Sequence, residues 1–248
     1  MKEVRYFFAP DAVTADELPE EEAQHAVRVL RLTEGDEIYL MDGKGTFYRA
    51  MVTMAHGRRC SYSIVETLPQ QPLWNGRVHL AMAPTKMMER VEWMAEKATE
   101  IGCDEFSFLL CRFSERKQMR EDRVEKTVLS AVKQSRKPWM PQVNALTPFT
   151  EFIKTPRQGR KFICHCYDEI PRADLYAILS GTSPDHQPVA PEEEVTVLVG
   201  PEGDFALEEV QQAMAEGYVS VSLGNARLRT ETAALSAVMM TQLAKRRA

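Results

Sequence analysis

The sequence predicts two domains, a small β-barrel with one helix followed by an α/β domain whose sheet is mostly parallel. Three observations predict this fold class. Short runs rich in β-branched and aromatic residues fill the first seventy positions. A polar stretch with two prolines follows at 68–72, and strand and helix patterns then alternate along the rest of the 248 residues. We therefore place the domains at 1–70 and 73–248, a division that suits this chain length.

One helix is expected in the first domain. Pro19 and the acidic residues after it suit the first turn of a helix, and apolar residues then recur at helical spacing over 23–30. Before this helix, residues 6–8 are two phenylalanines preceded by a tyrosine. They indicate a short apolar strand in the barrel core, and the alternative is that an aromatic ring stacks on an RNA base.

Strands fill the rest of the first domain. We expect them at 37–41, 46–54 and 61–67, where β-branched and aromatic residues are frequent. The sequence Asp42-Gly43-Lys44-Gly45 predicts a hairpin turn between the first two strands. Together with the helix, these strands predict a small β-barrel.

The second domain alternates strands with helices. Strands are expected at 77–83, 105–110, 161–166, 195–199 and 219–223, and helices at 86–101, 122–135, 175–179, 207–215 and 230–245. This alternation favours a mostly parallel sheet with helices on both faces. The proline-rich, acidic stretch 181–194 is expected to form an exposed loop.

The composition is that of an ordinary globular protein, with 44% hydrophobic and 27% charged residues. No apolar run is long enough to cross a membrane, and the first residues lack the apolar segment of a signal peptide. We therefore expect a cytoplasmic protein with no membrane partner. The five cysteines are an odd number, which favours buried free thiols in a reducing compartment.

The sequence Cys164-His165-Cys166 contains residue types that bind metals. On a strand, however, the two cysteines of such a triplet point to one face and the histidine to the other. No second pair of ligands at metal-binding spacing accompanies them. We therefore expect no metal site.

The net charge of −5 conceals a local contrast. Segment 111–137 carries nine Lys and Arg against four Asp and Glu, whereas 151–210 carries twelve acidic against five basic residues. A basic segment on an acidic protein is typical of an RNA-binding surface. It is equally typical of a solvated helix face, and charge alone does not decide between the two.

Two glycine-bearing turns near the C-terminus are the strongest functional signal. Gly200-Pro201-Glu202-Gly203 and Leu223-Gly224 each end an apolar strand and precede a helix. Such turns place backbone N–H groups at the carboxyl end of a sheet, where ligands bind. Neither a dinucleotide fingerprint nor a P-loop is present, so the site is not built around a pyrophosphate or triphosphate. An ordinary tight turn remains the alternative for the first motif.

Arginines crowd the start of the final expected helix. Arg227 and Arg229 stand just before it, where positive charge opposes the helix dipole. A local conflict of this kind indicates a functional reason, such as an anionic ligand or a carboxylate that must be oriented.

Taken together, the two turns and the sequence Leu228-Arg229-Thr230-Glu231-Thr232-Ala233 resemble the RsmE family of 16S rRNA (uracil-N3) methyltransferases, which belong to the SPOUT class. The resemblance spans nearly the whole chain. Its further segments are 96–102, 114–116, 131–136, and 25–31 with Gly35-Asp36. The chain departs from the family in small ways, of which Asp204 is one, since many members have a glycine there.

The resemblance implies a PUA-like RNA-binding β-barrel domain followed by a SPOUT methyltransferase domain with a C-terminal trefoil knot. It also implies a homodimer, S-adenosylmethionine as cofactor and 16S rRNA as substrate, within the 30S subunit. The cofactor-binding residues carried over by position are Leu198, Val199, Gly200, Glu202, Gly203, Leu223, Gly224, Asn225, Leu228 and Arg229.

Basic residues of both domains are candidates for holding RNA phosphates, although each is as readily a surface charge. They are Arg28, Arg31, Arg58, Arg59, Arg112, Arg116, Lys117, Arg120, Lys133 and Arg136.

The implied reaction needs help with a proton, because uridine N3 is protonated at neutral pH. Within the motifs, Arg229 is the candidate cation that stabilises the uridylate, and Glu202 and Glu231 are candidates for accepting the proton or orienting Arg229. The alternatives are a helix N-cap role for Glu231 and a turn carboxylate role for Glu202. Positioning alone lowers barriers substantially, so a single essential base need not exist.

Two other functions stay open. The first is a SPOUT enzyme with another target, such as a ribose 2′-hydroxyl or a guanine in tRNA. Ribose methylators end the motif with S-L-N, where this chain has Ser222-Leu223-Gly224. The second is an RNA-binding protein without catalysis, and the presence of both glycine turns and Arg229 argues against it.

Overall fold

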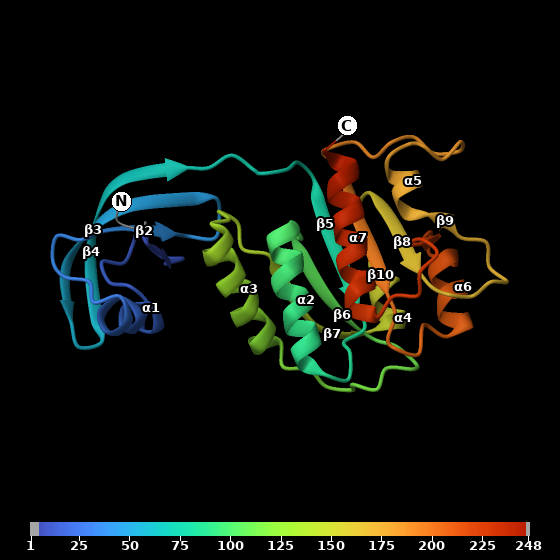
Figure 1. Cartoon of the computed structure of the whole chain (residues 1–248), viewed down its shortest axis with the longest axis horizontal. Coiled ribbons are helices and arrows are strands. Elements are labelled where there is room, and N and C mark those ends of the chain that lie inside the picture. The colour runs from blue at the N-terminus through green and yellow to red at the C-terminus, as the bar shows by residue number, and fades with distance from the viewer. Residues whose placement is uncertain (1–4, 247–248) are drawn as a thin grey trace. The chain divides into compact units, whose positions relative to one another are not determined.

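A computed structural model describes residues 5–246, which form two compact units (Figure 1). The first unit comprises residues 5–73 together with Val132–Met140, and the second comprises 74–131 and 141–246.

Within the described residues, the first unit contains one four-stranded sheet in the order β1-β2-β3-β4. Its strands are β1 (Tyr6–Phe8), β2 (Glu37–Met41), β3 (Thr46–His56) and β4 (Arg59–Pro69). β1 runs parallel to β2, and the other two pairs are antiparallel. The Asp42 carboxylate accepts hydrogen bonds from the amides of Lys44 and Thr46 at 2.7 and 3.0 Å, which confirms the predicted hairpin turn.

The helix of the first unit consists of two parts. A regular turn, α1 (Glu20–Gln24), continues as a π-helical turn, η1 (His25–Val29). Ala23 and Ala26 are buried in a core that also contains Phe7. Phe7 is fully buried, which confirms the apolar interpretation of its strand, whereas the ring of Tyr6 packs against Tyr39 and Phe47 outside this cluster.

The sheet of the first unit is open between β1 and β4, because no strand pairing joins them in residues 5–246. The segment between β1 and α1 lies along the free edge of β4 instead. The Leu18 amide donates to the Cys60 carbonyl at 2.9 Å, and the Tyr62 amide donates to the Asp16 carbonyl at 2.8 Å. An irregular segment thus takes the place of the regular barrel closure that the sequence analysis expected.

The second unit is built on a seven-stranded sheet, counted over the described residues, in the order β7-β6-β5-β10-β8-β11-β9. Its strands are β5 (Arg77–Met82), β6 (Glu105–Leu110), β7 (Gln142–Pro148), β8 (Arg160–Cys164), β9 (Ala173–Asp174), β10 (Glu194–Val199) and β11 (Val219–Ser222). All of its strand pairs are parallel, as predicted. The central strand β10 is apolar and buried from Val195 to Val199, the pattern of a strand covered on both faces.

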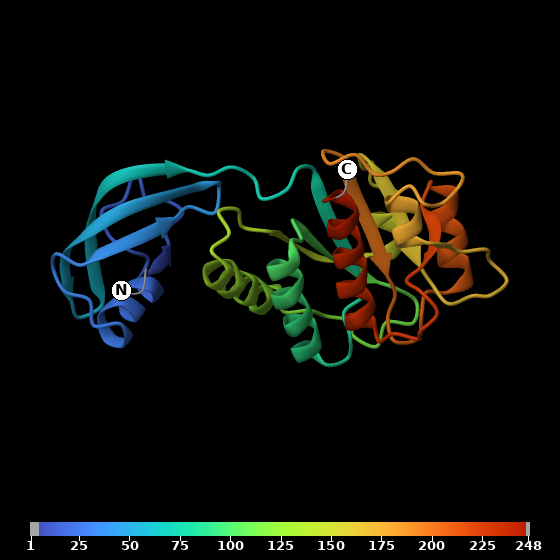
Figure 2. The ribbon, with the colours of Figure 1, turned by 45° about the horizontal axis from the view of Figure 1, so that its top comes forward.

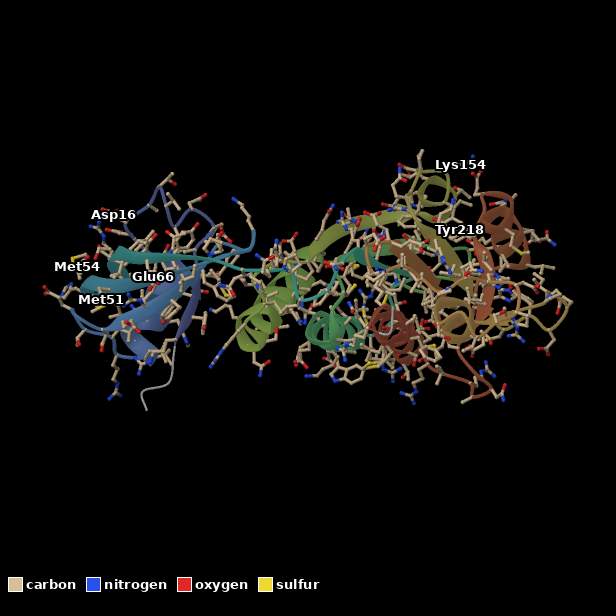
Figure 3. All side chains as sticks on the ribbon, turned by 90° about the horizontal axis from the view of Figure 1, so that it is seen from above. Asp16, Met51, Met54, Glu66, Lys154 and Tyr218 are labelled. Atoms are coloured by element: carbon tan, nitrogen blue, oxygen red, sulfur yellow. The ribbon has the colours of Figure 1, made fainter. Side chains whose placement is uncertain are left out.

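Helices cover both faces of this sheet. They are α2 (Met88–Ile101), α3 (Glu121–Ser135), α4 (Phe149–Phe152), α5 (Leu175–Leu179), α6 (Leu207–Ala215) and α7 (Thr230–Lys245). α7 packs beside α2 and against β5 (Figure 2). Lys154, just after α4, lies on the opposite side of the sheet (Figure 3). β7, β9 and α4 have no counterpart in the sequence analysis.

A histidine, His79 of β5, is buried inside the second unit. Its Nε2 lies 2.9 Å from Ser107 Oγ, and its Nδ1 accepts a hydrogen bond from Arg157 at 3.2 Å. Burial, together with the positive charges of Arg157 and Arg77, lowers the pKa of His79 to about 3. The imidazole is therefore neutral in the folded protein at neutral pH.

Acid is expected to destabilise the protein through His79. The unfolded chain binds the imidazole proton near pH 6.5 and the folded chain only near pH 3. Between these values the unfolded state binds one more proton, so the free energy of unfolding falls by about 1.4 kcal/mol for each unit by which the pH is lowered. Urea unfolding at pH 7, 6 and 5 measures this slope. His79→Asn should lower this slope by the equivalent of about one proton bound on unfolding. An unchanged slope in the variant would contradict the assignment.

Candidate active site

The structure brings the two glycine turns together at one pocket of about 1110 Å³. Three segments form most of its wall, and each follows the carboxyl end of a strand: 164–172 after β8, 199–204 after β10 and 221–233 after β11. Arg90, from the first turn of α2, completes it. A pocket of this size at the carboxyl edge of a parallel sheet suits a nucleoside-sized ligand.

The first turn leaves no room for side chains. A Cβ atom on Gly200 would lie 3.0 Å from the Phe205 amide nitrogen and 3.1 Å from Phe205 Cδ2. A Cβ on Gly203 would lie 3.3 Å from Phe113 Cβ. Glycine at both positions therefore lets the backbone pass close to its neighbours and keeps the pocket wall thin.

Asp204 occupies the left-handed region, with φ of +66°. This explains why a glycine also suits the position. The aspartate compensates through its carboxylate, which accepts hydrogen bonds from the amides of Phe205 at 2.7 Å and Cys166 at 2.8 Å. Asp204 thus ties the turn after β10 to the segment after β8.

The second turn offers unpaired backbone groups to the pocket. Gly224 has φ of +104° and open space where a Cβ would stand. In residues 5–246, no hydrogen bond is donated by the backbone amides of 224–228. Leu223 and Leu228, which also line the pocket, are half-buried. The turn thus combines free amides and carbonyls with apolar side chains.

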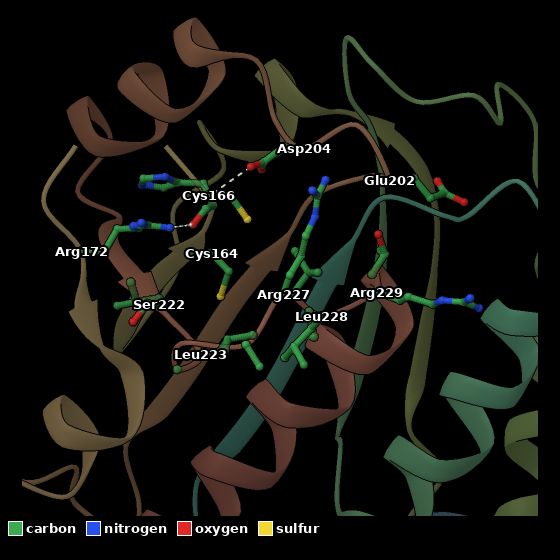
Figure 4. A pocket seen from close by; sticks show the side chains of 18 of the residues that line it. Cys164, Cys166, Arg172, Glu202, Asp204, Ser222, Leu223, Arg227, Leu228 and Arg229 are labelled. Atoms are coloured by element: carbon green, nitrogen blue, oxygen red, sulfur yellow. Dashed lines mark hydrogen bonds between the residues drawn. The ribbon is translucent and has the colours of Figure 1, made fainter. Parts of the chain in front are cut away.

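Arg227 and Arg229 both line the pocket and are exposed. Neither guanidinium group makes a hydrogen bond or an ion pair within the described part of the chain. Figure 4 shows that their side chains diverge: Arg227 extends between Cys166 and Glu202, and Arg229 points toward the neighbouring helix. Both guanidinium groups are available to an anion, but at different sides of the pocket.

Glu231 is buried, with 7% of its surface exposed. It is the second residue of α7, and the N-cap is Arg229, so the N-cap role considered for Glu231 is wrong. Its Oε1 lies 3.5 Å from Arg90 Nη1, and its Oε2 has no hydrogen-bond partner in residues 5–246. The sequence analysis missed Arg90, which holds this carboxylate at the pocket wall.

Glu202 is exposed at the rim of the pocket (Figure 4). Its Oε1 accepts a hydrogen bond from the Lys86 amide at 2.9 Å. That amide belongs to the segment between β5 and α2, so Glu202 joins two loops at the carboxyl edge of the sheet. This is the turn-carboxylate geometry, and a catalytic role for Glu202 stays a prediction.

The triplet 164–166 does not lie on one strand as the sequence analysis assumed, because β8 ends at Cys164. His165 Nε2 lies 2.6 Å from Ser220 Oγ, and the Cys166 amide binds Asp204. Over the residues that the structure describes, no group of three or more His, Cys, Asp and Glu side chains is arranged for a metal ion. The five cysteines, all in this part of the chain, form no disulfide; only Cys166 is exposed, contrary to the expectation that all are buried.

Most of the proposed RNA-binding residues are engaged within the chain. Five pair with carboxylates: Arg58 with Glu20, Arg59 with Glu17, Arg112 with Glu208, Arg120 with Asp122, and Lys133 with Glu22. Arg116 donates to the carbonyls of Thr85 and Lys86, and Arg136 lies over the Tyr6 ring. Three make no hydrogen bond or ion pair in residues 5–246, namely Arg28, Arg31 and Lys117. RNA binding by all ten stays a prediction.

Comparison with known proteins identifies the family. Residues 72–242 match the family model of the RNA methyltransferase domain, and residues 18–64 match that of the RNA methyltransferase PUA domain. The chain belongs to this RNA methyltransferase family. Its second unit has the α/β methyltransferase fold, and its first is the PUA-like domain. None of the helices in residues 5–246 is long and apolar enough to span a membrane.

Similar proteins agree with this membership. The ribosomal RNA small subunit methyltransferase E of Synechocystis is 31% identical over 209 residues, which cover 83% of this chain and 65% of that protein. A crystal structure of a probable rRNA-methyltransferase from Porphyromonas gingivalis is 36% identical, with a TM-score of 0.88 over 98% of this chain and 99% of that one. The ribosomal RNA small subunit methyltransferase E of Neisseria gonorrhoeae, bound to S-adenosyl methionine, is 25% identical, with a TM-score of 0.81 over 97% and 98%. The family resemblance drawn from the sequence is confirmed.

Proposed function

We propose that this protein is an S-adenosylmethionine-dependent methyltransferase that methylates N3 of a specific uridine in 16S rRNA of the small ribosomal subunit. The observation that carries the proposal is the pocket formed by the two glycine turns in a chain of this RNA methyltransferase family. Its support includes the Neisseria relative, a small subunit rRNA methyltransferase bound to S-adenosyl methionine.

The pocket residues fit the cofactor. The free amides of 224–228 suit the polar edge of an adenine, and the apolar side chains of Val199, Leu223 and Leu228 suit its face. Leu198 is fully buried in the core of the second unit and is not among the residues that line the pocket, so its contact with the cofactor stays a prediction. Gly200 and Gly203 let the turn that forms this wall pack closely against Phe205 and Phe113, and Glu202, Asn225 and Arg229 stand at the pocket rim. When bound, the cofactor supplies an activated methyl group.

The residues of the chain act on the uridine. Arg229, which has no internal side-chain partner in the described residues, stabilises the negative charge that develops as the proton of N3 passes to a carboxylate, for which Glu202 and Glu231 are the candidates. Glu231 pairs with Arg90 and so holds the Arg90 guanidinium at the pocket wall. With the cofactor bound, the pocket would hold N3 of the uridine in line with the methyl group that the cofactor supplies.

Cofactor binding is expected to be sensitive to Gly200. An added Cβ would press on the Phe205 backbone, which cannot move without shifting the turn. Gly200→Ala should raise the Kd for S-adenosylmethionine by about tenfold, the equivalent of about 1.4 kcal/mol. Gly203→Ala should have a smaller effect, because its nearest neighbour is the Phe113 side chain at 3.3 Å. Calorimetric titration measures both, and equal affinities in wild type and Gly200→Ala would contradict the assignment.

Further features belong to this proposal. Residues 1–70 bind RNA and 73–248 carry out methyl transfer, with a trefoil knot in the C-terminal part, as the family resemblance implies. The protein is a homodimer, supported by exposed apolar side chains on the adjacent helices α2 and α7, namely Trp93, Met239 and Leu243.

The rRNA substrate is presented to the protein within the 30S subunit. Because its substrate is rRNA, the protein acts in the cytoplasm, the location expected from the sequence.

Methyl transfer to purified RNA tests the substrate. The protein and labelled S-adenosylmethionine are incubated with 30S subunits, with free 16S rRNA and with tRNA, all from a strain that lacks this activity. Label is expected in 16S rRNA, in the subunit or free. Label in tRNA alone would overturn the substrate assignment.

A further inference from the structure

Phe113 is a large apolar side chain that the proposed mechanism does not use, and 46% of its surface is exposed. It lies in the tight turn 111–114 after β6. The Cys111 amide donates to Ser114 Oγ at 3.0 Å, and the Ser114 amide donates to the Cys111 carbonyl at 3.1 Å. The Arg112 amide donates to Glu209 of α6 at 2.9 Å. Three hydrogen bonds therefore hold the backbone on both sides of an exposed ring.

The base of the Phe113 side chain lies against the pocket wall. A Cβ on Gly203, which lines the pocket, would lie 3.3 Å from Phe113 Cβ and 3.9 Å from its Cγ. The glycine thus lets the base of the Phe113 side chain lie directly against the turn that we assign to the cofactor. An exposed aromatic ring at this place is positioned for a ligand that reaches the pocket from outside.

The segment that carries Phe113 is basic in composition, although three of its four cations are engaged within the chain: Arg112 with Glu208, Arg116 with two carbonyls and Arg120 with Asp122. The segment 112–120 contains Arg112, Arg116, Lys117 and Arg120 and a single acidic residue, Glu115. The Arg112 guanidinium lies 5.7 Å from the centre of the Phe113 ring. Lys117 is exposed and unpaired within residues 5–246. A rigid aromatic ring among positive charges matches single-stranded nucleic acid better than an apolar protein surface.

We propose that Phe113 is a stacking platform for an RNA base at the entrance of the pocket. The inference rests on the proposed function, since it assigns the ring to the substrate of that site. A base that is methylated on its pairing edge must leave its stack, and an aromatic ring replaces the stacking that is lost. Phe113 therefore positions the RNA strand and does not touch the cofactor.

Kinetics with three variants separate stacking from simple apolar contact. Phe113→Leu keeps apolar bulk but no aromatic face, and we expect both it and Phe113→Ala to raise the KM for 16S rRNA about tenfold. Phe113→Trp should keep the wild-type KM within about twofold. The Kd for S-adenosylmethionine should stay within about twofold in all three. Met214→Ala, which removes an exposed apolar side chain of α6 outside the pocket, is the matched control and should change nothing.

A binding measurement tests the inference without relying on activity. Poly(U) should quench the fluorescence of Phe113→Trp more than that of the wild-type protein, because a stacked base quenches an indole. If the wild type methylates no rRNA but this quenching occurs, the proposed function fails and the stacking role stands. If rRNA is methylated while Phe113→Leu has a wild-type KM and poly(U) causes no added quenching, the stacking role is overturned. A change of oligomeric state in Phe113→Ala would also overturn it, by assigning the ring to contact with a second copy.

Discussion

Arg229→Ala is expected to lower the turnover of methyl transfer about 100-fold while the Kd for S-adenosylmethionine stays within about threefold. The guanidinium is exposed and has no internal partner in residues 5–246, so its removal leaves the fold intact. Its loss withdraws charge stabilisation from the uridylate as N3 is deprotonated. Single-turnover rates with saturating cofactor, together with a cofactor titration, separate the two quantities.

Two variants control this experiment. Arg229→Lys keeps the charge and should recover part of the lost turnover, although a point charge cannot replace a planar guanidinium fully. Arg246→Ala removes an exposed arginine just after the other end of the same helix and should leave turnover unchanged. Wild-type turnover in Arg229→Ala would remove this residue from the mechanism.

Arg90→Ala is expected to destabilise the protein by about 2 kcal/mol. The substitution removes the counter-charge of the buried Glu231 carboxylate, since Arg90 is the cation that faces Glu231 Oε1. Glu231 Oε2 already lacks a partner in the described chain, so the variant leaves both carboxylate oxygens uncompensated. Arg90 is half-buried, which screens the pair and keeps the effect below that of a fully buried one. Urea unfolding at neutral pH measures the loss.

The double variant decides whether the buried charge is the cause. Arg90→Ala with Glu231→Gln has no charge left to compensate and should recover at least half of the stability lost in Arg90→Ala. Glu231→Gln alone should raise the KM for RNA, because Arg90 is no longer held at the pocket wall. A double variant as unstable as Arg90→Ala would show that the loss comes from packing and not from charge.

The second unit could be predicted from the sequence where its strands are fully buried. β5 and β10 are near-continuous apolar runs, and this pattern indicates strands of a sheet that is covered on both faces. β7 was missed because it is an edge strand, with exposed and half-buried residues along its length and no apolar run. α4 has only four residues, too few for a helical period to register.

The glycine turns of the site were predictable because backbone demands mark a sequence directly. Gly200 needs the absence of a Cβ, and Gly224 needs a positive φ. The role of Arg90 could not be predicted in this way, since an arginine near the start of an amphipathic helix is typical of a solvated face. Only the packing of α2 beside α7 brings it to Glu231. The same limit applies to most of the basic residues: apart from the Asp122 partner of Arg120, their carboxylate partners lie far away in the sequence.

The identity of the methylated atom is the most direct test of the proposed function. 16S rRNA from a strain that lacks this activity is treated with the protein and S-adenosylmethionine and digested to nucleosides, which are separated by chromatography and identified by retention time and mass, since 3-methyluridine and 2′-O-methyluridine have the same mass. We expect 3-methyluridine at one position per 16S rRNA molecule, and none with Arg229→Ala at the same short reaction time. A 2′-O-methylated nucleoside or a methylated guanosine in its place would contradict the proposed function.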